Sequence, residues 1–147
     1  MKILKLMLIV ALGSPMVAFA QKTEIPGAVT SNFSKEYDVV NPETNVNWVI
    51  KDDKFIAKFK LEDKKSEITY NSNGLKLESL VEISKERLKH YHYDYVKENY
   101  PKAIIFLAYL QNSEVAPERM VLDIIEDGKT TRLYFRPDGT FFQEVKL

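Results

Sequence analysis

Residues 54–83 read KFIAKFKLEDKKSEITYNSNGLKLESLVEI, and this stretch decides the fold class. Phe55, Ala57 and Phe59 recur at every second position, with Lys58 and Lys60 pointing the other way, which is the two-residue period of a half-buried strand. Further along, Asn73-Gly74 separates two strand-like runs, and both residues tolerate the positive φ that a tight hairpin requires. The stretch therefore predicts consecutive antiparallel strands joined by short turns.

Outside this stretch, apolar residues spaced four apart predict two helices. Val29, Phe33 and Tyr37 mark the first, which begins near Pro26, and the second covers 84–100. The expected strands are 46–51, 54–61, 66–71, 75–83, 103–110, 119–126, 130–136 and 140–146. The fold class is thus α+β, as two tandem repeats at about 25–83 and 84–147. Each repeat is a helix plus four strands, and together they form one antiparallel sheet with the helices packed on one face.

The first 20 residues have the pattern of a cleavable signal peptide. Lys2 and Lys5 precede a short apolar run, and Ala18-Phe19-Ala20 matches the motif that signal peptidase recognises. The apolar run is shorter than the roughly 20 residues that span a bilayer, so no membrane anchor is expected. Cleavage before Gln21 leaves one domain, residues 21–147, located in the periplasm or secreted.

Composition excludes several classes of protein. Of the 21 basic and 21 acidic residues, two lysines lie in the signal segment, so the remaining chain carries a slight negative charge. Nucleic-acid binding, which requires a basic excess, is therefore not expected. The chain has no cysteine, which excludes disulfides, thiol catalysis and cysteine-ligated metals.

The same positions resemble the PepSY-like proteins grouped with the beta-lactamase inhibitory protein fold, which are small exported proteins of the Bacteroidota. The matching residues are Pro26, Val29, Phe33, Tyr37, Trp48, Phe55, Ala57, Phe59, Tyr70, Gly74, Leu88, Val96, Tyr100, Pro101, Ile105, Phe135, Asp138 and Gly139. The pattern is broken at Asp38, Lys89 and Lys102, where the family commonly has proline, proline and glycine. The resemblance implies a single eight-stranded antiparallel sheet backed by helices, and no catalytic residues.

Catalytic and metal-binding patterns are not apparent. His90 and His92, the two histidines, would point roughly 200° apart on a helix and could not chelate one ion. His92 is expected at the core edge, with His90 in solvent. Pairs of carboxylates such as Asp52-Asp53 fall in predicted turns, where aspartate serves turn geometry. We therefore expect no enzyme activity, no cofactor and no metal.

The sheet face opposite the helices is the candidate binding surface. If Phe55 and Phe135 face the helices, basic side chains and a tyrosine occupy the other face, which two helices could not also cover. The candidate residues are Lys58, Lys60, Arg132, Tyr134 and Arg136. Arginine and tyrosine are enriched at binding hot spots. An ordinary solvated sheet face is the competing interpretation.

These patterns favour a non-catalytic binding protein, an inhibitor or modulator that docks an extracytoplasmic protein or peptide. The alternative is a small-molecule carrier with a pocket between helices and sheet, lined by Trp48 and tyrosines. A third hypothesis, an unrecognised hydrolase, would require titratable groups converging in a cleft.

Overall fold

The computed structural model describes residues 24–114 and 116–147, so the expected signal peptide and its cleavage site lie outside the described residues. The elements in chain order are α1 (Gly27–Glu36), β1 (Asn47–Lys51), β2 (Lys54–Leu61), β3 (Lys64–Tyr70), β4 (Lys76–Ile83), η1 (Lys85–Arg87, a 3₁₀ turn), α2 (His90–Asn99), β5 (Ile104–Ser113), β6 (Arg119–Glu126), β7 (Lys129–Phe135) and β8 (Phe141–Lys146). The α+β class is confirmed.

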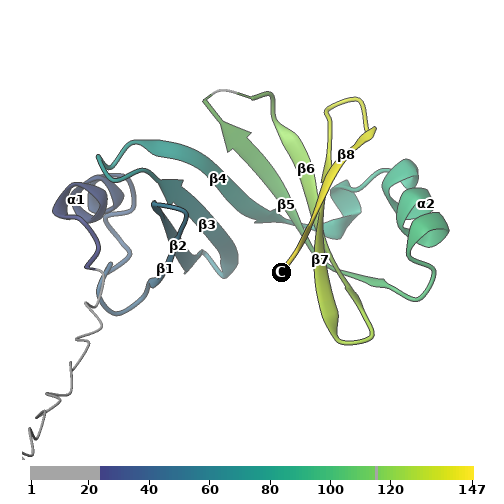
Figure 1. The fold of residues 1–147 in the computed structure, drawn as a ribbon, viewed down its shortest axis with the longest axis horizontal. Helices are drawn as coiled ribbons and strands as arrows, with labels where there is room; N and C mark the ends of the chain where they lie inside the picture. Colours follow the sequence, from purple (N-terminus) through teal and green to yellow (C-terminus); the bar gives the residue numbers. More distant parts are fainter. Residues whose placement is uncertain (1–23, 115) are drawn as a thin grey trace, which may run out of the picture.

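All eight strands form one sheet in chain order, each antiparallel to its neighbours (Figure 1). Short turns make this order possible. At Asp52-Asp53, Glu62-Asp63 and Asp127-Gly128 both central residues have positive φ, which matches the right-handed twist of the strands they join. The single antiparallel sheet expected from the sequence is therefore confirmed.

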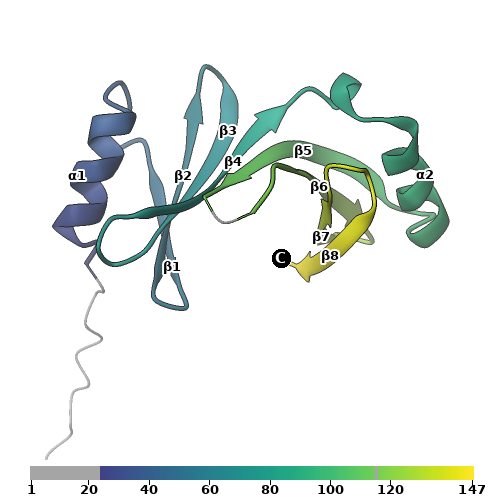
Figure 2. The same cartoon turned by 90° about the horizontal axis from the view of Figure 1, so that it is seen from above.

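The sheet is curled, and the two helices lie at its opposite ends (Figure 2). The strand register places Phe55, Ala57 and Phe59 on the face that carries the helices. We call this the outer face, and the opposite one the inner face. In the following, residues 24–83 are the first half of the molecule and residues 84–147 the second half.

Each helix closes its own hydrophobic core on the outer face. The first core surrounds Val29 and Phe33 of α1, both 0% exposed, and the Phe33 ring contacts those of Trp48 and Phe59 at 5.5 and 5.1 Å between centroids. The second core surrounds Val96 of α2 and Phe135. The two helices therefore stabilise separate ends of the sheet.

The second predicted helix is shorter than expected at its start. Residues 84–100 were predicted as one helix, but Leu88 has an extended backbone (φ −69°, ψ 141°) between η1 and α2. Its side chain is buried in the second core. The helix begins later than predicted because Leu88 reaches the second core from an extended segment and not from a turn of the helix.

Both helices pack against a glycine turn. Gly74 has a φ of +80°, and a Cβ there would lie 2.5 Å from the Ala28 backbone oxygen of α1. Gly139 has a φ of +87°, and a Cβ there would lie 2.3 Å from the Tyr91 ring of α2. These turns need glycine both for their backbone conformation and for the close approach of a helix.

Candidate binding surface on the inner face

The inner face carries a third buried cluster instead of an open surface. Leu80, Tyr109 and Val121 are 3% exposed or less, and Leu107 and Tyr134 pack against them. The curl of the sheet brings β4–β7 together closely enough to bury these side chains. The expectation that this face is open is therefore wrong over its middle, where no helix is needed to cover it.

The structure places the five predicted binding residues in different environments. Lys58 and Lys60 of β2 keep solvent exposure, with 42% of the Lys58 side chain accessible. Tyr134 is half-buried in the third cluster. Arg136 is exposed but lies past the end of β7, in the turn to β8. The predicted exposure of Arg132 is wrong, since it is only 6% exposed.

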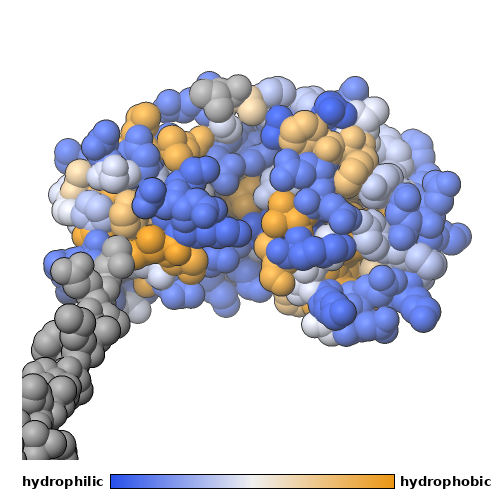
Figure 3. Space-filling view, viewed as in Figure 1, coloured by the Kyte–Doolittle hydropathy of each residue, from blue (hydrophilic) through white to orange (hydrophobic). Residues whose placement is uncertain are grey.

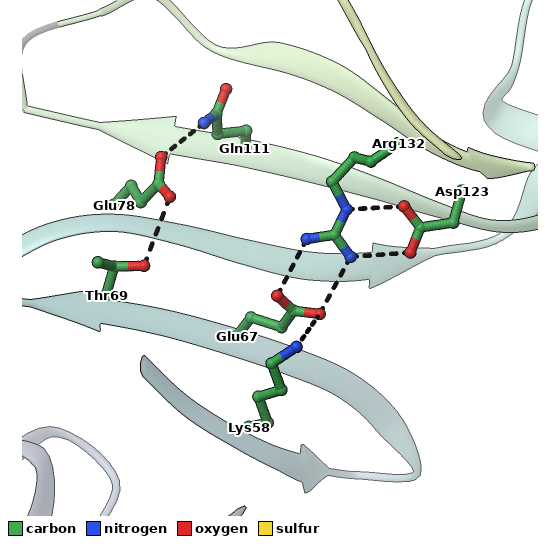
Figure 4. A network of polar contacts seen from close by, with 7 residues as sticks. All are labelled: Lys58, Glu67, Thr69, Glu78, Gln111, Asp123 and Arg132. Atoms are coloured by element: carbon green, nitrogen blue, oxygen red, sulfur yellow. Dashed lines mark hydrogen bonds and ion pairs between the residues drawn. The ribbon is translucent and has the colours of Figure 1, made fainter. Parts of the chain in front are cut away.

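Arg132 is buried because two carboxylates surround its guanidinium group (Figure 4). Its Nε and Nη2 donate to Asp123 at 2.7 and 2.8 Å, and its Nη1 and Nη2 donate to Glu67 at 3.0 Å each. Such paired, charge-assisted bonds fix both distance and orientation. Lys58 completes the group with its Nζ 3.6 Å from Glu67. We call these four residues the ion network.

The ion network joins the two halves of the chain. Asp123 and Arg132 are direct cross-strand partners in β6 and β7, and Lys58 and Glu67 are direct partners in β2 and β3. The contact between Glu67 and Arg132 connects these two pairs across 65 residues. Because β3 and β7 are not neighbours in the sheet, this contact depends on the curl.

The electrostatics suit a structural connection. Burial raises the pKa of Glu67, but the hydrogen bonds and charge of Arg132, together with Lys58, outweigh it and hold that pKa below its usual range. Burial alone would lower the pKa of Arg132, but bonds to Asp123 and Glu67 raise it. A general acid needs a raised carboxyl pKa, so Glu67 is a poor candidate for acid–base chemistry.

A second polar group lies beside the network. Glu78 of β4 accepts a hydrogen bond from Gln111 of β5 at 2.7 Å and one from Thr69 of β3 at 3.4 Å. The Gln111 Oε1 atom is buried without a hydrogen-bond partner in the part of the chain that the structure describes. Together with the ion network, these residues give the inner face a polar lining (Figure 4).

Cationic and aromatic side chains gather toward the β8 end of the sheet. The guanidinium carbons of Arg119 and Arg136 lie 4.2 and 4.9 Å from the centroid of the Phe142 ring. Phe142 is 38% exposed. Sequence reasoning missed Arg119 and Phe142. The strand alternation of 119–126, which puts Arg119 on the same face as Asp123, could have indicated the first.

The histidines lie as expected. His92 is 2% exposed, and its Nδ1 accepts the Lys89 N–H at 3.1 Å, whereas His90 is exposed. Burial is the main cause that lowers the pKa of His92. Among residues 24–114 and 116–147, no cluster of three or more potential ligands could hold a metal ion.

Comparison with known proteins relies on structure alone. No family model matches the sequence, and no curated protein matches it. Solved structures do match. A DUF2874 family protein from Bacteroides ovatus is 20% identical, with a TM-score of 0.62, and the match covers 84% of this chain and 88% of that one. The chain has the fold of these Bacteroides proteins.

Two further structures extend the likeness. A protein from Bacteroides eggerthii, presumed to be periplasmic, is 8% identical with a TM-score of 0.66, and the match covers 84% of this chain and 89% of that one. A BLIP-like protein from Bacteroides fragilis is 19% identical with a TM-score of 0.57, covering 83% and 86%. The expected relation to the beta-lactamase inhibitory protein fold is thus confirmed at the level of fold.

Where the structure describes the chain, no helix is long and apolar enough to cross a membrane.

Proposed function

We propose that this chain is an exported, non-catalytic binding protein that docks a protein of the extracytoplasmic space on the inner face of its sheet. The observation that carries the proposal is the ion network, which fixes the curl and so presents a preformed concave surface. Preformed surfaces bind with less loss of conformational freedom than mobile ones. The likeness to a BLIP-like protein supports a binding role for this fold.

The exposed rim of this surface would make the contacts. In the space-filling view the molecule is hollowed between its two halves, with hydrophilic and apolar groups on either side (Figure 3). Lys58 and Lys60 lie on the first half, and Arg136 and Phe142 on the second. A concave surface with cations on both sides suits a partner with acidic groups, through electrostatic complementarity.

The test is capture of partners from the envelope and secreted fractions with residues 21–147, using two charge-reversed variants. Lys58→Glu with Lys60→Glu changes the inner face, and Lys35→Glu with Lys97→Glu changes the helices on the outer side. We expect the first variant to lose a stoichiometric partner that the second retains. Equal capture by both variants would remove the inner face from the proposal.

The alternative function, a small-molecule carrier, requires a pocket lined by Trp48, and the Trp48 side chain packs against the first core instead. Trp48 fills space between α1 and the sheet, since its ring contacts Phe33 and its Nε1 donates to the Pro42 carbonyl at 3.0 Å. It is therefore committed to packing. No specific observation favours a ligand beside it.

We also propose that the two halves arose by duplication and belong with the PepSY-like proteins. Two features recur in both halves. Tyr37 and Tyr100 end their helices in the same way, each donating its N–H to the carbonyl four residues earlier at 2.8 Å. Gly74 and Gly139 donate their N–H groups to Asn71 and Arg136 at 3.0 and 2.9 Å in turns of equal length.

Export itself has a direct test. Intact-mass measurement of protein recovered outside the cytoplasm should give a chain that begins at Gln21. A mass that includes the first 20 residues would contradict the proposed cleavage.

A further inference from the structure

We propose that a small cavity beside the start of α2 is a binding site for an oxyanion, the chemistry shared by carboxylate and phosphate groups. The cavity has a volume of about 180 Å³. Its walls come from η1, the first turn of α2 and the adjoining ends of β5, β6 and β7. The site shares Arg136 with the rim of the proposed docking surface, but its test uses small anions and needs no protein partner.

Four cationic side chains line the cavity: Arg87, Lys89, Arg119 and Arg136. The one acidic residue among the lining is Glu118. Within residues 24–114 and 116–147, none of these four cations has a carboxylate within 4.0 Å, whereas Arg132, Lys58, Lys76 and Lys146 all do. The cavity is thus a concentration of uncompensated positive charge.

Arg119 gives the strongest indication of an anion site. Its Nε is buried and has no hydrogen-bond partner among the described residues. A buried guanidinium donor without an acceptor is costly, and such donors in native structures usually have a partner. The Phe142 ring holds this guanidinium group in place, with its centroid 4.2 Å from the guanidinium carbon, but it provides no acceptor for the Nε–H.

Arg136 is fixed near the same ring. Its Nη1 donates to the Phe141 carbonyl at 3.1 Å and to Thr140 Oγ1 at 3.3 Å, and its guanidinium carbon lies 4.9 Å from the Phe142 centroid. Both guanidinium groups lie near one ring and carry like charge, and an anion bound in the cavity that they line would offset their repulsion. Guanidinium groups pair with planar or tetrahedral oxyanions through two parallel N–H bonds.

The fold adds to this field and limits the ligand. Helix α2, ten residues long, starts at His90, so its positive end points to the same region. The Tyr91 ring packs on Gly139 and keeps the wall near Arg136 in place. A volume of about 180 Å³ corresponds to roughly six waters at about 30 Å³ each, which admits one phosphate or a short carboxylic acid.

The test is titration of residues 21–147 with inorganic phosphate and, separately, with acetate, at constant ionic strength set by chloride, followed by NMR. We expect saturable shifts of the Arg119 and Arg136 side-chain N–H signals with at least one of the two anions. Arg119→Gln should weaken that binding at least tenfold, and Lys129→Gln, in the β6–β7 turn, should leave it unchanged.

A second variant keeps the test decisive if Arg119→Gln fails to fold. Arg136→Gln removes the exposed guanidinium group and should also weaken binding at least tenfold. Saturation by phosphate alone or acetate alone would identify the preferred oxyanion. Shifts that never saturate with either anion, or that persist unchanged in Arg136→Gln, would overturn the site.

Discussion

The two halves of the molecule have a similar arrangement of helix and strands but pack different side chains beneath the helix. In the first half, the inward positions of α1 are Val29 and Phe33, and Asn32 seals the helix onto the turn by donating to the Gly74 carbonyl at 3.0 Å. In the second half, the inward positions of α2 are His92 and Val96, and a cavity with basic walls lies beside the helix.

This difference shows where a small fold can place polar chemistry. The first half packs three aromatic rings around Phe33 and leaves no buried titratable group in α1. In the second half, a buried histidine and the arginines at the cavity take the place of part of this aromatic packing. The ion network then ties the two unequal halves into one curved sheet.

The largest effect is expected from Phe33→Ala, which empties the centre of the first core. We expect a loss of about 3–5 kcal/mol in the free energy of unfolding. Val96→Ala, at the inward position of α2, should cost less because fewer carbon atoms are removed. Urea denaturation measures the free energy of unfolding of both variants. Equal losses would mean that the two helices contribute equally to the stability of the fold.

Breaking the connection between the halves should come next. Arg132→Met leaves Asp123 buried without its partner, and we expect a loss of about 3 kcal/mol or more. Lys58→Met is the matched control, because its ammonium group is partly exposed and its pairing is worth about 1 kcal/mol or less. If chemical denaturation found both variants as stable as the wild type, the ion network would not stabilise the fold.

The two glycine turns should differ in their tolerance of a side chain. Gly74→Ala places a Cβ against the α1 backbone, while Gly139→Ala places one against a tyrosine ring that can shift. We therefore expect Gly74→Ala to cost more than Gly139→Ala. Gly128→Ala, with a φ of +76° and open space around it, isolates the backbone strain of about 1–2 kcal/mol. Thermal unfolding should rank the three variants in that order.

The buried His92 predicts a pH dependence of stability below pH 6.5 that arises in the second half. Because the pKa of His92 is lower in the folded chain, the unfolded chain binds more protons below pH 6.5. Stability should therefore fall as the pH drops from 6.5 toward the folded pKa, by at most about 1.4 kcal/mol per pH unit. The lowered pKa of Glu67 acts separately, below pH 4.5.

His92→Val introduces the residue type that α1 has at Val29 and should flatten the stability profile between pH 6.5 and 5. The groups facing His92 are the Lys89 N–H and the rings of Tyr91 and Phe135, with the cations of the cavity nearby. Denaturation curves across this pH range measure the slope. An unchanged slope in the variant would assign the pH dependence to other groups.

The smallest effect is expected at the surface. Lys76 pairs with Glu36 and so connects β4 to α1, but both side chains are more than a third exposed. Lys76→Met should change the free energy of unfolding by less than about 1 kcal/mol. A larger loss in urea denaturation would mean that this ion pair helps to hold α1 in place.

Much of the fold could be predicted because its determinants are local. Alternation in 54–61 and the turn residues at 52–53, 73–74 and 127–128 specify strands and hairpins within a few residues. The four-residue spacing of Val29 and Phe33 likewise determines which side of α1 is buried. The start of α2 was misjudged, where the buried side chain of Leu88 determined an extended backbone, and β5 extends to Ser113, past the expected end at 110.

The inner face could not be predicted in the same way. Alternation correctly assigned Arg132 to the face opposite the helices, but its burial depends on Glu67, 65 residues earlier, and on how far the sheet curls. Nothing in the local pattern measures that curl. The cavity at Arg119 and Arg136 was missed for the same reason, since it forms where four separate segments of the chain meet.

The most direct test of the account is a double-mutant cycle between Glu67→Gln and Arg132→Met, measured by urea denaturation. If the ion network joins the two halves, the two substitutions should be coupled by about 1–3 kcal/mol. The double variant would then lose clearly less stability than the sum of the single losses. Strict additivity would contradict the claim that this contact fixes the curl of the sheet.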